Sequence, residues 1–426
     1  MNISPRNAID VLVTRAEAAE MGGATQEADL LWREIALKAP GHARLLVRQA
    51  RRQTIARDFV GALDTLARAA ATNPQDPEIF LEEALTLRVM GNLPRALESV
   101  STALTLDPYH FLALLAKGSI HEQMGRIRAA AKIYRDVLRI APPLERLPPA
   151  LRSAMEHAKD VVVRNAEAIA QHLRLETQGL RAQFSGQNLK RFDEGLEVFA
   201  GTKKRFVHEP ILFDFPQLPA LTFYDRSYFP WAEKLEAATP IFQAELEKVM
   251  REDWERFNPY IQLPAGAPVN QWTALNRSPD WSTFFLWRDG TRNDDGCRRC
   301  PQSAAALESL PLAHQPGFGP TAMFSVLQPR TNMPAHTGST NVRLICHLPL
   351  ILPGNCRFRV GNDVREWRMG ESFVFDDSIE HEAWNDSGQV RVVLIFDVWN
   401  PLLTEAERSL VAAMMNARNS FYGAET

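Results

Sequence analysis

The chain has 426 residues, of which 45% are hydrophobic and 23% are charged, and this length accommodates two domains with separate cores. A formal net charge of −3 argues against a nucleic-acid partner, and no run of about 18 apolar residues predicts a membrane span. Four cysteines are too few for a disulfide framework, and the N-terminus lacks a signal-peptide pattern, so we expect a cytoplasmic protein with no membrane partner.

A period of 34 residues runs through residues 1–142 and resembles the tetratricopeptide repeat (TPR). Small residues let helices approach closely, glycine ends a helix and proline interrupts the chain. One of the four repeating series consists of glycines, and Arg57 stands where its second glycine would be. The pattern predicts an α-solenoid of TPR-like helix pairs, whose concave face serves either protein or peptide docking or assembly. The four series are Pro40, Pro74, Pro108 and Pro142; Ala28, Ala62, Ala96 and Ala130; Ala16, Ala50, Ala84 and Gly118; and Gly23, Gly91 and Gly125.

Residues 143–205 continue with helical spacing of apolar side chains, which predicts capping and connecting helices. Near residues 201–206 the composition changes to prolines, aromatic residues and short strand-like segments. We therefore predict a second domain over residues 206–415, followed by a C-terminal tail over residues 416–426.

Two segments of the second domain alternate as strands do. In residues 341–352, Leu344 and Cys346 face one way, and Ile345 faces the other. Residues 389–399 form a second β-prone run. Short strands are also predicted at 357–362 and 371–377, and such spacing is typical of a sandwich or barrel.

Three of the ten histidines, His336, His347 and His381, fall in this β-rich region, while most others are scattered singly. Cys297 and Cys300 form a C-x-x-C pair, but no second pair lies nearby in a zinc-binding pattern. We therefore interpret these two cysteines as free thiols.

Several segments resemble the aspartyl/asparaginyl β-hydroxylase family, and the resemblance covers roughly residues 208–412. It implies an α + β two-domain chain in which the TPR-like solenoid precedes a double-stranded β-helix (jelly-roll, cupin-like) oxygenase domain. It also implies the cofactor Fe(II), the co-substrate 2-oxoglutarate and O2. The segments are HTGSTNVRLICHLPL (336–350), FVFDDSIEHEAWND (373–386), VRVVLIFDVWNP (390–401), FPWAEKLEAATPIFQAEL (229–246) and FFLWRDGTRNDDGC (284–297).

By this resemblance, His336 and His381 are the two metal ligands. Related oxygenases carry a carboxylate ligand two residues after the first histidine, where this chain has Gly338. The resemblance implies that the third protein ligand is absent. Arg391 and Ser325 match the residues that bind the distal carboxylate of 2-oxoglutarate, a task suited to a planar bidentate donor.

The resemblance assigns three further positions. His347 matches a residue near the other end of the co-substrate. Asp377 matches an acidic residue near the iron. Its neighbour Asp376 either takes that acidic role instead or forms a turn. Ile345 stands where well-known members carry arginine. Arg343 on the same strand face is a candidate to supply the missing charge, and we group it with the co-substrate-binding residues Arg391, Ser325 and His347. Substrate preference is therefore not inherited from those members.

Three functions remain open from the sequence. The first is a 2-oxoglutarate-dependent dioxygenase that hydroxylates an Asp, Asn or other residue of a protein or peptide, with the TPR-like region helping to bind it. The second is a hydroxylase of a small molecule or lipid. The third is a binding or scaffold protein with an inactive oxygenase domain, against which the intact His336, His381 and Arg391 argue.

Overall fold

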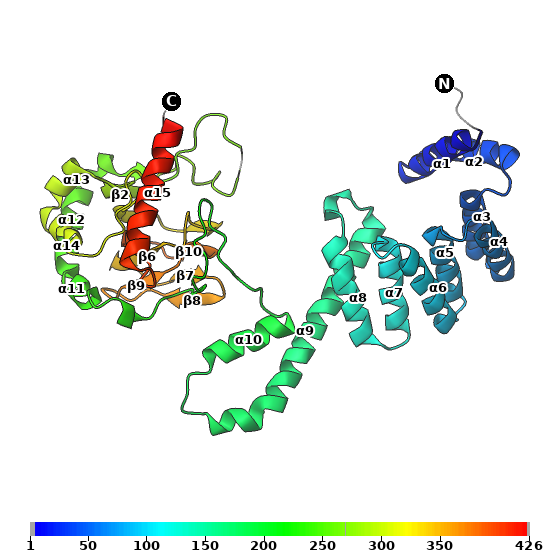
Figure 1. The fold of residues 1–426 in the computed structure, drawn as a ribbon, viewed down its shortest axis with the longest axis horizontal. Helices are drawn as coiled ribbons and strands as arrows, with labels where there is room; N and C mark the ends of the chain where they lie inside the picture. Colours follow the sequence, from blue (N-terminus) through cyan, green and yellow to red (C-terminus); the bar gives the residue numbers. More distant parts are fainter. Residues whose placement is uncertain (1–4, 269, 424–426) are drawn as a thin grey trace. The chain divides into compact units, whose positions relative to one another are not determined.

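The chain divides into two units in a computed structural model that describes residues 5–268 and 270–423 (Figure 1). The first unit, Met1–Lys203, is helical, and the second, Lys204–Thr426, contains the described strands. Over the described parts of both units, no helix combines the length and apolar character needed to cross a membrane.

The first unit begins with four helix pairs, and the two helices of each pair pack against each other. The second, third and fourth pairs begin at residues 43, 77 and 111, so the predicted period of 34 and the TPR-like architecture are confirmed. The pairs are α1 (Pro5–Met21) with α2 (Thr25–Lys38), α3 (Ala43–Ile55) with α4 (Phe59–Thr72), α5 (Pro77–Val89) with α6 (Leu93–Leu106), and α7 (Phe111–Gln123) with α8 (Ile127–Ile140).

The repeated small residues lie where these helices pack. Ala62 and Ala96 are fully buried. Gly118 stands in the place of an alanine because the Tyr134 ring occupies the space that a Cβ would need. The repeated glycines have positive φ angles at helix ends, and Arg57, which replaces one of them, adopts the same left-handed conformation with φ 63°.

Helices continue to the end of the first unit, as the sequence predicts for residues 143–205. A short 3₁₀ turn, η1 (Leu144–Arg146), leads into the 35-residue helix α9 (Pro149–Gln183). This helix packs against α8, and α10 (Lys190–Ala200) packs against α9 in turn.

Two antiparallel sheets form the second unit, in agreement with the predicted jelly-roll domain. The large sheet has the order β1-β2-β4-β11-β6-β9 with β3 paired to β2, and the small sheet has the order β5-β10-β7-β8. The large sheet comprises β1 (Asn258–Pro259), β2 (Trp281–Arg288), β3 (Thr291–Arg292), β4 (Ala322–Leu327), β6 (Arg343–Ile351), β9 (Phe373–Phe375) and β11 (Arg391–Trp399); the small sheet comprises β5 (Thr331–His336), β7 (Cys356–Val360), β8 (Asp363–Glu366) and β10 (His381–Asn385).

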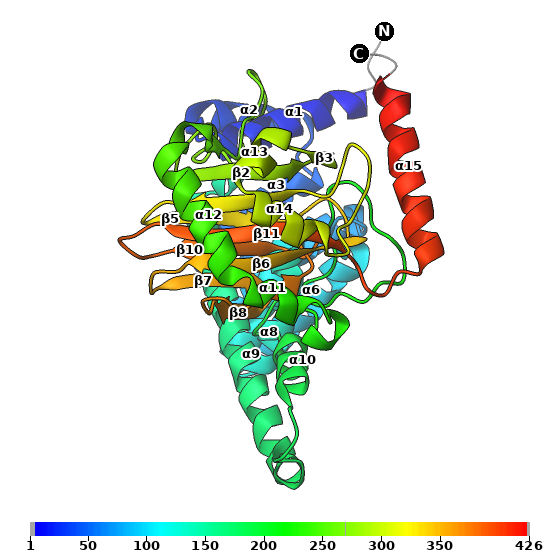
Figure 2. The same cartoon turned by 90° about the vertical axis from the view of Figure 1, so that its left-hand side faces the viewer.

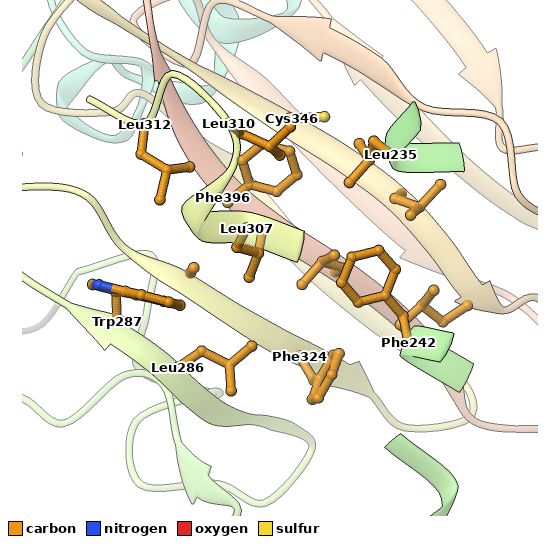
Figure 3. Packing of buried hydrophobic residues seen from close by; sticks show 14 of the residues in the cluster. Leu235, Phe242, Leu286, Trp287, Leu307, Leu310, Leu312, Phe324, Cys346 and Phe396 are labelled. Atoms are coloured by element: carbon orange, nitrogen blue, oxygen red, sulfur yellow. The ribbon is translucent and has the colours of Figure 1, made fainter. Parts of the chain in front are cut away.

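The two faces of the large sheet have different roles. Leu344 and Cys346 belong to an apolar core that includes helical residues such as Phe242 and Leu307, whereas Ile345 belongs to a second core shared with the small sheet. Figure 3 shows part of the first core, and Figure 2 shows α12 lying across the sheet. The predicted alternation is therefore confirmed. The helices of this unit are η2 (Arg226–Tyr228), α11 (Ala232–Ala237), α12 (Thr239–Glu252), η3 (Trp254–Arg256), α13 (Asp294–Arg299), α14 (Pro301–Glu308) and α15 (Glu405–Gly423).

The last helix replaces part of the predicted C-terminal tail. Residues 416–423 are helical because α15 continues to Gly423, and the rest of the predicted tail lies outside the described residues. Val411 and Met415 of α15 are buried in a small apolar cluster with Val342 and Leu403. These contacts hold the helix on the second unit.

Candidate functional site

Sheet pairing joins the two histidines that lie 45 residues apart in the sequence. His336 ends β5, His381 begins β10, and the two are direct partners in the small sheet, with ring centroids 4.1 Å apart. The Nδ1 of His336 hydrogen-bonds to the Pro334 carbonyl at 2.7 Å, and the Nδ1 of His381 hydrogen-bonds to the Ile379 carbonyl at 3.0 Å. A carbonyl only accepts, so each Nδ1 carries the proton and each Nε2 keeps a lone pair.

Burial keeps both imidazoles neutral. It lowers the pKa of His336, and together with the neighbouring His336 ring it lowers the pKa of His381 well below its ordinary value. Neutral imidazole is the form that binds a metal. The two Nε2 atoms are thus suited to hold one divalent ion.

Gly338 and Asp377 share the space where a third ligand would stand. The Gly338 N–H donates to the Asp377 carbonyl at 2.6 Å, and a Cβ on Gly338 would overlap the Asp377 carboxylate. Burial raises the pKa of Asp377 to about 8, and its Oδ1 has no hydrogen-bond partner among the described residues. Over those residues no set of three His, Cys, Asp or Glu side chains has a metal-binding arrangement, so the donor set comprises the two histidines.

Arg391, the first residue of β11, is a fully buried cation to which no described residue is hydrogen-bonded through the side chain. None of its three guanidinium nitrogens has a hydrogen-bond partner among the described residues, and its guanidinium carbon lies 4.7 Å from the Trp367 ring centroid. Burial lowers its pKa to about 10. A buried, unpaired guanidinium is costly unless an anion binds it, and a carboxylate matches its planar donors. The residues therefore fit 2-oxoglutarate.

Ser325 and His347 lie on the same inner face of the large sheet as Arg391. Ser325 pairs with Val393 across β4 and β11, and its hydroxyl oxygen accepts the Trp281 indole N–H at 3.0 Å, which leaves the hydroxyl proton free to donate. The His347 Nδ1 has no partner among the described residues. Burial, with smaller contributions from the positive Arg391 and from His381, lowers the pKa of His347 well below its ordinary range.

A cavity of about 330 Å³ opens between the two sheets and contains the histidine pair. Its wall is largely aromatic and apolar, with a few polar groups, which is typical of a small-molecule site. The lining includes Ile211, Tyr260, Trp272, Trp281, Asp289, Phe318, Thr321, Met323, His336, Arg343, Ile345, His347, Phe358, Phe375, Asp377, His381 and Asp397.

The structure separates Arg343 from the other residues predicted to bind the co-substrate. Its Nη1 donates to Asp397 Oδ2 at 2.6 Å and to the Phe318 carbonyl at 3.1 Å. Asp397 lies six residues along β11 from Arg391, which corresponds to about 20 Å of strand. Grouping Arg343 with Arg391 is therefore corrected: Arg343 lies at the opposite end of the strand.

Residues 208–211, which no sequence motif singles out, cross the two turns that lie next to His336 and His381. The Glu209 N–H donates to the Ser378 carbonyl at 2.8 Å, and the Ile211 N–H donates to the Gly338 carbonyl at 2.9 Å. His208 Nε2 lies 3.2 Å from Asp376 Oδ2 in a buried ion pair. These contacts span more than a hundred residues of chain, and no local pattern in the sequence signals them.

Asp376 also forms a turn, because its Oδ1 accepts the Ser378 N–H at 3.0 Å and the Ser378 hydroxyl at 2.6 Å. The four cysteines are buried free thiols. Burial raises the pKa of Cys297 to about 11 and that of Cys300 to about 12, which disfavours the reactive thiolate.

Residues 236–401 match the family described as aspartyl/asparaginyl beta-hydroxylase. The chain is 37% identical over 197 residues to an ornithine lipid ester-linked acyl 2-hydroxylase of Rhizobium tropici, covering 45% of this chain and 65% of that protein. It is 38% identical over 141 residues to an aspartyl/asparaginyl beta-hydroxylase of Homo sapiens, covering 33% of this chain and 18% of that protein. The chain thus spans less than two thirds of the length of these relatives.

The first unit resembles solved TPR structures. The match to the Arabidopsis OM64 TPR domain covers 28% of this chain and 94% of that domain, with 15% identity and a TM-score of 0.25. The helix pairs of the first unit define its TPR-like architecture independently of this match.

Proposed function

Because the chain carries an aspartyl/asparaginyl β-hydroxylase family domain behind a TPR-like helical region, we propose that it is an Fe(II)- and 2-oxoglutarate-dependent dioxygenase that hydroxylates an unactivated C–H bond. The observation that carries this proposal is the fully buried, unpaired Arg391 in the same domain as His336 and His381, whose Nε2 lone pairs are free.

In this proposal, the Nε2 atoms of His336 and His381 hold Fe(II). Arg391 binds the distal carboxylate of 2-oxoglutarate with its planar donors, and Ser325 donates its hydroxyl proton to the same group. Fe(II), 2-oxoglutarate and O2 together supply the oxidising chemistry when they are bound. His347 lies within electrostatic range of both Arg391 and His381, and burial favours its neutral form.

The protein orients the reactants and excludes water. Phe358 packs against the rings of His347 and Phe375 with centroid distances of 5.0 and 4.7 Å, and Trp367 lies beneath Arg391. These rings exclude water from the co-substrate end of the site. The resulting low dielectric constant strengthens each charged hydrogen bond there.

The acceptor that we propose first is a residue of a protein or peptide, and the TPR-like region supports this choice because stacked helix pairs form extended binding surfaces. A small molecule or lipid is the second candidate, and the similarity to the Rhizobium tropici acyl 2-hydroxylase favours it.

The test requires no acceptor. Under anaerobic conditions, Fe(II) and then 2-oxoglutarate are added to the full chain, and the visible charge-transfer band of their complex is recorded. We expect a band in the parent, no band in His381→Ala, and a 2-oxoglutarate affinity at least about tenfold weaker in Arg391→Ala. Arg391→Lys keeps the charge but loses the planar geometry, so it should be intermediate.

Arg357→Ala is the matched control, since Arg357 is half exposed and pairs with Asp386. It should leave the band unchanged. A parent protein that binds Fe(II) but gives no band would disprove the proposed function and favour an inactive binding protein.

A further inference from the structure

At the end of the cavity near Arg343, which we call the acceptor end, the described residues offer no unpaired cation. Among the described lining residues, Arg343 is the only arginine or lysine. Its guanidinium is bound to Asp397, which is 2% exposed and whose Oδ2 also accepts the Thr321 N–H at 2.8 Å. Next along the same face of β6 stands Ile345, which is apolar and buried. A carboxylate ligand would have to compete with Asp397 for the guanidinium.

Acidic side chains outnumber basic ones among the described residues that line this cavity. Asp289 and Asp377 line it in addition to Asp397. Asp377 is 7% exposed, and its Oδ1 has no hydrogen-bond partner among the described residues. Burial favours the neutral form of Asp377 in the empty site, and a cation beside its unpaired oxygen would favour the carboxylate. Asp289 lies at an exposed turn, where its 3.6 Å ion pair with Arg288 is solvated and weak.

Aromatic faces accompany these carboxylates. Tyr260, Trp272 and Phe318 line the cavity, and the Tyr260 and Trp281 ring centroids are 4.4 Å apart. Phe318 already binds one cation on its face, because the Arg343 guanidinium carbon lies 4.5 Å from its centroid. Aromatic rings beside carboxylates favour ammonium and guanidinium groups over anions.

We propose that the acceptor carries a cationic group, an ammonium or a guanidinium, which binds among Asp289, Asp377 and the aromatic rings. This inference rests on the proposed function and specifies its substrate class. An acidic side chain is disfavoured because Asp397 neutralises Arg343.

Three probes of similar size and different charge test this inference: Nα-acetyl-L-lysinamide, Nα-acetyl-L-norleucinamide and the α-amide of Nα-acetyl-L-glutamate. Their dissociation constants are measured on the anaerobic full chain with Fe(II) and 2-oxoglutarate, from the change in tryptophan fluorescence. Trp272 and Trp281 line the cavity and serve as the fluorescent reporters. In the variant Trp272→Phe an aromatic ring remains but one reporter is removed, so a smaller signal change would assign the signal to Trp272. We expect the lysine probe to bind at least about tenfold more tightly than the glutamate probe, with the norleucine probe between them.

Two variants separate charge from shape. Asp397→Asn releases Arg343, so the glutamate probe should gain about tenfold in affinity while the lysine probe loses affinity. Asp289→Asn alters an exposed side chain, so its folding is preserved, and it should weaken the lysine probe several-fold and leave the norleucine probe unchanged. If Asp397→Asn fails to fold, as judged by circular dichroism, Asp289→Asn alone decides.

A parent protein in which the lysine probe does not bind, or binds no better than the norleucine probe, would overturn the inference. Tighter binding of the glutamate probe in the parent would overturn it as well. The visible band is recorded on the same samples, so a band without cation preference contradicts only the substrate class, whereas a missing band contradicts the proposed function itself.

Discussion

At the scale of single residues, Gly338 and Asp377 compete for one volume. A Cβ on Gly338 would overlap the Asp377 carboxylate, so the chain accommodates one of these two side chains and not both. A glycine at this position therefore follows from packing as well as from the number of metal ligands.

We expect Gly338→Asp to lower the free energy of unfolding by about 1–3 kcal/mol through overpacking, and to reduce metal binding. Combining it with Asp377→Gly makes room for the new carboxylate and should restore most of the lost stability. Chemical denaturation and equilibrium dialysis with Fe(II) measure the two effects. Normal stability and metal content in Gly338→Asp alone would contradict the shared-volume explanation, and Asp377→Gly alone is the control.

His208 gives a pH-dependent contribution. Burial is the largest single influence and would lower its pKa, but Asp376, with smaller contributions from Asp214 and the Pro219 backbone, outweighs burial, and the net shift is upward. A raised pKa means that the folded state binds the proton more tightly than the unfolded state. The contribution is therefore fully present below the unfolded pKa of about 6.5 and is lost as pH rises through the folded pKa.

We accordingly expect the free energy of unfolding of the parent to exceed that of His208→Gln most below about pH 6.5, and this difference to shrink as the pH rises above that value. Denaturant melts at matched pH values measure this. His172→Gln is a suitable control, because His172 is largely exposed and its distance to Glu176 is 3.9 Å. Equal pH slopes in the parent and His208→Gln would show that the ion pair with Asp376 contributes nothing.

At the scale of elements, the helix pairs repeat a backbone conformation as well as a set of side chains. Gly91 and Gly125 have φ angles of 80° and 72°, and Arg57 is held at 63° in the corresponding turn. A left-handed conformation costs a non-glycine residue about 1–2 kcal/mol, and part of that cost is recovered when glycine replaces it.

Arg57→Gly should therefore raise the free energy of unfolding of the first unit by about 0.5–1 kcal/mol. Thermal melts followed by circular dichroism at the helical signal measure the change. Gly91→Ala is the matched reverse substitution and should destabilise by about 1 kcal/mol. A destabilised Arg57→Gly would mean that the Arg57 side chain makes a contact worth more than the backbone strain.

Strand β11 of the second unit carries residues of the proposed site at both of its ends. Arg391 and Asp397 lie on one face of β11 at opposite ends, so in the proposed function a single strand separates the co-substrate carboxylate from the acceptor. Arg343 shares a strand face with Ile345, but its guanidinium is bound to Asp397. The acceptor end has its own ion pair, and the co-substrate end has its own unpaired cation.

At the scale of the whole molecule, the predicted site residues all lie in the second unit. Ligands that bind only the folded state stabilise it by about 2.7 kcal/mol at a hundred times their dissociation constant. We therefore expect anaerobic Fe(II) with 2-oxoglutarate to raise the unfolding temperature of the second unit by about 5–10 °C and that of the first unit by much less.

Differential scanning calorimetry of the full chain measures this, with His381→Ala as the control that should show no shift. A single transition that moves as a whole would instead indicate that the two units unfold cooperatively.

Local patterns account for what could be predicted from the sequence. The 34-residue period predicts the helix pairs because each repeat is a local unit that packs on its neighbours. The alternation around Ile345 predicts the faces of the strands, because side-chain direction along a strand depends on position alone. The site positions His336, His381 and Arg391 were predicted by the resemblance of their segments to a known family. The C-terminal tail was assigned in part wrongly, because burial of Val411 and Met415 against distant residues stabilises α15.

The sequence by itself determined the two-unit architecture, the faces of the strands and the residues that form the proposed site, since these follow from period and motif. Only the tertiary structure decided which charges meet: Arg343 pairs with Asp397, His208 pairs with Asp376, and Arg391 has no hydrogen-bond partner within the part of the chain that the structure describes. Ion pairs depend on separations of a few ångströms between residues far apart in the chain, and no local pattern records those separations.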